Sequence, residues 1–173
     1  MKASDCIAVA KEMIGEGNEN TLLLCLNNCL DEIACEYAPS YVTEKAVSYG
    51  GIISFSSLSN EVADVVNVTG DNGNVPFEVR ANGIYLENNG VYVVKYAVRP
   101  TVLSIDDEVS LPPKITCRIL CYGIIAEYYL ISGMFEEAVT WDKRFKDALC
   151  AYSHGRKEHP WNSVVFRKIC ACF

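Results

Sequence analysis

The sequence predicts an α+β protein: an antiparallel four-helix bundle with a small antiparallel β-meander inserted between its second and third helices, followed by an extended C-terminal arm. Three observations lead to this fold class. Apolar residues recur at helical spacing over residues 3–37 and 111–152. The repeat changes to every second residue between 47 and 100, as in strands. Residues 153–173 fit neither pattern, so we expect one domain over residues 1–152 and an arm over 153–173.

The composition is that of a folded protein. Half of the 173 residues are hydrophobic and 21% are charged, which excludes global disorder and allows one domain with a real core. No apolar run reaches the roughly 18 residues of a membrane span. The first residues also lack the uninterrupted apolar core of a signal peptide. We therefore expect a protein without membrane contact that folds in a reducing cytoplasm.

Two helices are predicted before the strands. The first covers residues 3–14, with Ser4 as its N-cap, and the glycines after it break the pattern. The second covers residues 21–37, with Asn20 as its cap and Pro39 as its stop. The polar residues of the second helix are interpreted as a solvated face: Asn27, Asn28, Asp31, Glu32 and Glu36.

The strand region is read from turn signals. Residues 49–55 are predicted to be a strand with a bulge at Gly50-Gly51. Further strands are expected at residues 62–69, 75–81, 84–87 and 91–98. Asn-Gly between alternating strands is a strong hairpin signal, and it occurs at 82–83 and 89–90. We therefore expect residues 84–87 to pair with both 75–81 and 91–98, in a sheet too small to bury its own core.

A second pair of helices is predicted over residues 111–152. Pro112 and Pro113 suit a helix start, and Ser132-Gly133 suits a helix end. The next helix begins with acidic residues and carries basic residues later, in agreement with the helix dipole. The short link predicts an antiparallel hairpin. Its first helix is apolar nearly all round, so it should be central and buried.

The nine cysteines are interpreted as free thiols. Cys25/Cys29 and Cys117/Cys121 are spaced i,i+4, so two pairs could in principle form a four-thiolate metal site. Zinc sites usually show CxxC spacing in loops, which this sequence lacks. Buried thiols acting as small apolar side chains are the better reading, and we expect no metal and no cofactor. A metal- or thiol-dependent enzyme is the less favoured alternative.

Few residues point to catalysis. The only histidines, His154 and His159, fall in the arm, and no P-loop or GxGxxG pattern occurs. The carboxylates at 106–108 are read as a solvated loop. Cys170 and Cys172 with His159 form only a weak metal signal. We therefore expect that the protein is not an enzyme.

The arm is basic on an acidic protein. It carries a net charge of +3, so the remaining residues carry −10 of the total of −7. Such a body should not grip nucleic acid through its phosphates, whereas the tail suits an acidic partner. The docking residues expected in the arm are the basic and large aromatic ones: Arg156, Lys157, Trp161, Phe166, Arg167, Lys168 and Phe173.

Two stretches resemble one known family. TLLLCLNNCLDEIACEY is similar to the second helix of the head–tail connector proteins of tailed bacteriophages, also called adaptors or head-completion proteins, which include the tail tubular protein A type. ILCYGIIAEYYLISGMFEEAVTWDKRFKDAL resembles the last helical hairpin of the same family. The order of helices and strands fits as well, so the resemblance covers roughly residues 3–152. The many cysteines and the CACF end depart from the family pattern.

The resemblance implies a structural virion protein, assembled in the bacterial cytoplasm and located at the head–tail junction. Family members form a homo-oligomeric ring, typically a dodecamer, between the portal protein and a tail-side nozzle or tail-tube protein. Genomic DNA passes through the lumen without sequence-specific binding, and the C-terminal segment commonly reaches the portal. The alternative is a cytosolic helical binding or regulatory module with a basic peptide tail.

Overall fold

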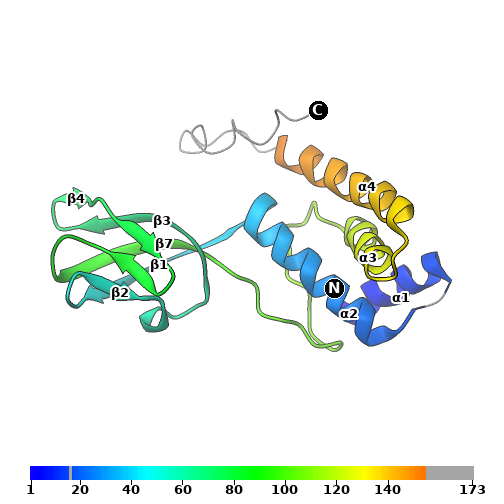
Figure 1. The fold of residues 1–173 in the computed structure, drawn as a ribbon, viewed down its shortest axis with the longest axis horizontal. Coiled ribbons are helices and arrows are strands. Elements are labelled where there is room, and N and C mark those ends of the chain that lie inside the picture. The colour runs from blue at the N-terminus through cyan, green and yellow to red at the C-terminus, as the bar shows by residue number, and fades with distance from the viewer. Residues whose placement is uncertain (16, 155–173) are drawn as a thin grey trace.

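The chain forms two bodies that lie side by side (Figure 1). The computed structural model describes residues 1–15 and 17–154. Within these residues, one body, called here the helical body, holds four α-helices, and the other, the strand body, holds seven strands. Two connections join them, one directly before the first strand and one directly after the last.

The helical body is built around its third helix. The elements are α1 (Ala3–Ile14), α2 (Glu19–Glu32), the π-helical continuation η1 (Ile33–Tyr37), α3 (Cys117–Ile131) and α4 (Phe135–His154). α3 contacts α1, α2 and α4, which confirms the prediction of a central, buried helix. Its fully buried Leu120, Ile124 and Ile125 join residues of the other helices in one apolar core. The helical hairpin α3–α4 is likewise confirmed, with Gly133 at φ 77° in the turn.

Local signals place the helix ends with small corrections. α1 has the predicted bounds, but its cap is Lys2, whose backbone N–H donates to Asp5 Oδ2 at 3.2 Å. α2 begins two residues early, because the side chain of Asn18 and not Asn20 accepts the N–H groups of Asn20 and Thr21. α3 begins late, at Cys117. The residue before a proline is disfavoured in helical conformation, so the Pro112-Pro113 pair forms a turn ahead of the helix.

In the described part of the chain, seven strands form two antiparallel sheets. They are β1 (Ser40–Ser48), β2 (Ile52–Ser54), β3 (Val62–Gly70), β4 (Gly73–Asn74), β5 (Glu78–Arg80), β6 (Gly83–Tyr85) and β7 (Gly90–Val98), with a short 3₁₀ helix η2 (Phe55–Ser57) after β2. One sheet has the order β1-β7-β3-β4 and the other β2-β6-β5. Both sheets contribute to a second core, in which Ile53, Ile84 and Val94 are fully buried.

The predicted fold class is therefore wrong. The helices do not form a four-helix bundle with a small meander, because the strand region has two sheets that bury each other's inner faces. β6 pairs with β5 as expected, but its other partner is β2 and not β7. β7 pairs instead with β1 and β3. One small sheet cannot bury a core of its own, whereas two sheets that face each other form one between them.

The structure also differs from the sequence prediction at two glycine positions. Gly50-Gly51 is not a bulge: both residues have positive φ, 61° and 76°, and they form the tight turn between β1 and β2. Gly83 is not a turn residue but lies in β6, opposite Ser54 and Arg80. A Cβ there would collide with the backbone oxygen of Ile53, so the close approach of β2 requires the glycine.

Candidate functional site

The predicted docking residues of the arm, from Arg156 to Phe173, lie outside the described residues. The structure does show where the arm begins. α4 packs against η1, and its C-terminal end points towards the strand body (Figure 1). Tyr37 of η1 and Tyr152 of α4 both pack against the helical core. Because η1 ends only three residues before β1, the arm leaves the helical body near the first residues of that strand.

An acidic face lies along α4 and the end of α2. Glu32 has a raised pKa, first because of burial and then because Glu36, Asp142 and Glu127 lie near it. Among the described residues, the one cation that acts on Glu32 is Lys146, whose Nζ lies 3.0 Å from Asp142 Oδ2. Three carboxylates, those of Asp142, Glu32 and Glu36, thus act on the ammonium group of Lys146. Additional positive charge close to this face would be attracted to it.

An apolar surface covers the turn between α3 and α4. Phe135 and Val139 are 64% and 69% exposed, and Leu130, Ile131 and Met134 beside them in the chain are also exposed. Monomeric proteins rarely display large apolar side chains so close together, and such patches often mark interaction sites. We call these five residues the apolar tip.

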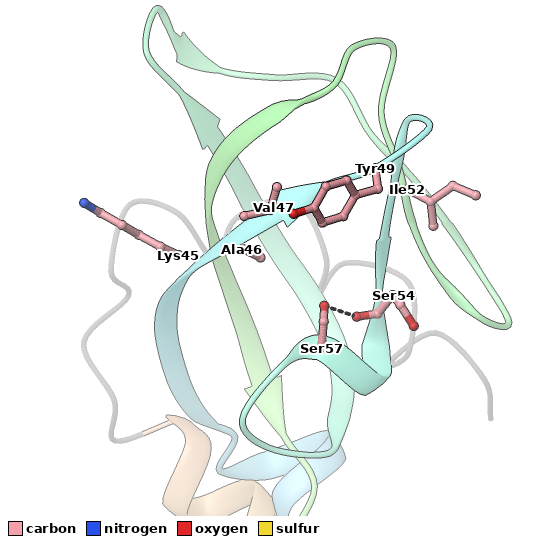
Figure 2. A pocket seen from close by; sticks show the side chains of 7 residues that line it. All are labelled: Lys45, Ala46, Val47, Tyr49, Ile52, Ser54 and Ser57. Atoms are coloured by element: carbon pink, nitrogen blue, oxygen red, sulfur yellow. Dashed lines mark hydrogen bonds between the residues drawn. The ribbon is translucent and has the colours of Figure 1, made fainter.

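The strand body presents an edge that no other described strand pairs with. β1 is the terminal strand of its sheet, and its nine residues pair with β7 from Ser40↔Val98 to Ser48↔Gly90. A depression of about 450 Å³ lies along the second half of β1 and extends to β2 and η2 (Figure 2). Its lining combines one lysine, four apolar or aromatic residues and two serines: Lys45, Ala46, Val47, Tyr49, Ile52, Ser54 and Ser57.

Sequence reasoning missed this edge strand. Residues 41–47 alternate between outward and inward positions in the structure, but the inward set includes Glu44 and the outward set includes Val47, so apolar and polar residues do not alternate in the sequence. The signal that could have found the strand is its content of β-branched and aromatic residues just before the Gly50-Gly51 turn. One inward-facing residue, Glu44, is hydrogen-bonded to a residue of the strand core. Its carboxylate accepts hydrogen bonds from Ser59 and from Tyr96 Oη, which lower its pKa. The strand is therefore held in place on its inner side, while its outer edge has no ladder partner among residues 1–15 and 17–154.

The described cysteines lie mostly in the helical core. Cys6, Cys25, Cys29 and Cys121 are buried and free, which agrees with their reading as small apolar side chains. Burial raises the pKa of Cys25 and of Cys121 to about 12, and it also raises the pKa of Cys6 and of Cys29 well above the ordinary thiol value. Cys117 Sγ lies 3.8 Å from Cys121 Sγ. Thiols held protonated in this way are poor nucleophiles and poor metal ligands.

The acidic segment at 106–108 has a structural task that the sequence did not reveal. The backbone oxygens of Ile105 and Asp107 accept the N–H groups of Ser4 and Ala3, the first residues of α1. The carboxylate of Asp107 accepts the N–H of Ser104 at 2.7 Å. Within residues 1–15 and 17–154, no group of three or more histidine, cysteine or acidic side chains is placed to hold a metal ion. In that same part of the chain, no helix combines the length and apolarity needed to cross a bilayer.

Neither a scan against models of known protein families nor a search of curated proteins finds a match to this chain.

Proposed function

We propose that this chain is a head–tail connector subunit of a tailed bacteriophage, with a structural and not a catalytic role. The observation that carries the proposal is the resemblance of two stretches far apart in the sequence. These stretches correspond to α2–η1 and α3–α4, which pack against each other in one core. Packing of this kind is what the family resemblance implies for the helical part.

Three surface properties support the proposal. A ring requires two different patches on each subunit that fit one another, and the apolar tip and the free edge of β1 offer such patches on separate bodies. The body of the chain is acidic, and a channel wall that repels phosphates would let DNA slide. The basic arm leaves from the end of α4, where it could reach out to an acidic portal surface.

The proposed assembly follows from these roles. Identical subunits, twelve in most members of the family, would form a closed ring in the virion between the portal and the tail-side nozzle or tail tube. The arm residues 153–173 would dock on the portal, and genomic DNA would pass through the lumen.

Electron microscopy of the full-length chain bound to its phage's portal-containing heads tests this proposal. The expected result is a closed ring beneath the portal, with contacts of at least about 1,000 Å² between neighbouring copies. A monomer or dimer by light scattering, with no density on the heads, would favour a cytosolic binding module instead.

A shortened chain tests the role of the arm. A chain ending at Tyr152 retains both apolar cores and should keep a cooperative unfolding transition. It should fail to join filled heads, because the proposed docking residues are missing. The matched control is the full chain with Glu158→Gln, which keeps every proposed contact and should join normally. Unchanged joining by the shortened chain would show that the arm is not the attachment device.

A further inference from the structure

The free edge of β1 is unusually open for a natural sheet. It runs for nine residues in register with β7, with no bulge along that pairing. The other side of the strand has no ladder partner in the described part of the chain beyond the Tyr49–Ile52 turn. Natural proteins protect such edges with proline, bulges, charged side chains, inward-pointing ones among them, or a covering segment, since bare N–H and C=O groups recruit other strands. β1 has two such charges, the inward-facing Glu44 and the exposed Lys45, but it has no proline, no bulge and no covering segment among the described residues.

The depression beside this edge is suited to the side chains of an added strand. Val47 and Tyr49 are 43% and 78% exposed at its rim, and Ile52 lies beside Tyr49 beyond the Gly50-Gly51 turn (Figure 2). The opposite wall is fixed, because Ser57 Oγ donates to the backbone oxygen of Ser54 at 2.6 Å. Strand addition at a sheet edge uses both features: the backbone supplies hydrogen bonds, and a neighbouring pocket receives alternate side chains.

We propose that residues 164–173 of this same chain add to the free edge of β1 as a further strand in the unassembled subunit. The sequence of this segment is VVFRKICACF. It has β-branched or aromatic residues at half of its positions and contains neither proline nor glycine, a composition enriched in strands. Pro160 precedes it and separates it from α4.

The position of α4 makes this edge reachable. Nineteen residues follow His154, and the first nine of them form a linker to the proposed strand. At about 3.3 Å per residue an extended linker of that length covers about 30 Å, and β1 itself is of similar length. The linker starts beside η1, which leads into β1. A tether this short gives an effective concentration in the millimolar range, so a modest strand interaction suffices.

Charge favours the chain's own segment over an outside peptide. The arm is basic and the rest of the chain is acidic. Arg156 and Lys157 follow directly after α4, whose surface shares the acidic face with Glu32 and Glu36. These residues would be attracted there and would lead the linker towards β1. The inference concerns the isolated subunit and does not depend on the proposed portal function, although a portal that bound the arm would uncover the edge.

Hydrogen–deuterium exchange on the full chain tests the proposal without any phage component. The variant Val165→Pro with Ile169→Pro removes two strand N–H groups, and Asn162→Pro in the linker is the matched control. We expect the slowest-exchanging amides of residues 40–48 that face away from β7 to exchange at least tenfold faster in the double variant. In the control and in the wild type they should exchange at equal rates.

A substitution at the rim of the depression tests the same contact from the side of β1. Val47→Asp places a charge at the exposed rim, so it should raise the same exchange rates while β3 and α3 stay protected. Equal exchange of residues 40–48 in the wild type and the double proline variant would overturn the proposal. Protection of these residues that falls on tenfold dilution would also overturn it, since the occupant would then be a second copy.

Discussion

Gly123 marks the point where three helices meet. A Cβ at this position of α3 would lie 2.7 Å from Cys29 Sγ of α2 and 3.0 Å from the Phe145 ring of α4. Both neighbours are buried, so neither can move away without disturbing the core. The glycine is thus a packing residue, although an alanine would favour the helix by about 1 kcal/mol.

We expect Gly123→Ala to lower the free energy of unfolding by about 1–2 kcal/mol, because overpacking in a dense core typically costs about 1–3 kcal/mol. Urea denaturation followed by circular dichroism measures the change. The control is the same substitution in a Cys29→Ala background, where the nearest obstacle is gone and the cost should shrink. A Gly123→Ala protein more stable than the wild type would show that the helices can separate freely.

Among the elements, helix bounds and turns could be predicted from nearby residues, whereas the pairing of strands far apart in the sequence could not. The bounds of α1 and the turn at Gly133 follow from residues close in sequence, so the pattern alone could predict them. β7 was recognised as a strand, but its partners β1 and β3 are determined by the shared core, which no local signal reports. The exposed surfaces could not be predicted either, because exposure depends on which elements pack together.

The polar face of α2 also makes contacts that the sequence alone could not predict. Asn27 was interpreted as solvated, yet its Oδ1 accepts the N–H of Leu103 at 2.7 Å and its Nδ2 donates to the Leu103 oxygen at 3.1 Å. Asp31 forms an ion pair with Arg99 at 3.1 Å. These contacts attach the segment after β7 to α2. The helix therefore holds the chain as it returns from the strand body to the helical body.

Asn27→Ala should lower the free energy of unfolding by about 1–3 kcal/mol, since it leaves two half-buried backbone groups of Leu103 without partners. Asn28→Ala is the matched control on the same helix. Asn28 is exposed and bonds only the Glu127 carboxylate, so its loss should cost less than about 0.5 kcal/mol. Thermal denaturation of both variants gives the comparison, and equal costs would mean that the Leu103 contacts add nothing.

At the scale of the whole molecule, the two cores have no residue in common. The helical core contains Leu120, Ile124 and Phe145, and the strand core contains Ile84, Val94 and Tyr96. The contacts between the bodies named above are surface contacts, such as the Arg99 ion pair with Asp31, in which both side chains are 46% exposed. Exposed pairs of this kind contribute little to stability. The two bodies should therefore unfold with little energetic coupling.

Truncations in the two cores test this independence. Leu120 and Ile84 are both fully buried, so Leu120→Ala and Ile84→Ala should each cost their own body about 2–5 kcal/mol. Hydrogen exchange should then show faster opening of α3 amides only in the first variant and of β6 and β7 amides only in the second. In the double variant the two effects should add within about 0.5 kcal/mol, as for distant sites with no shared partner. Faster exchange of β7 amides in Leu120→Ala alone would instead show one cooperative unit, in which the connections between the bodies transmit as much stability as either core.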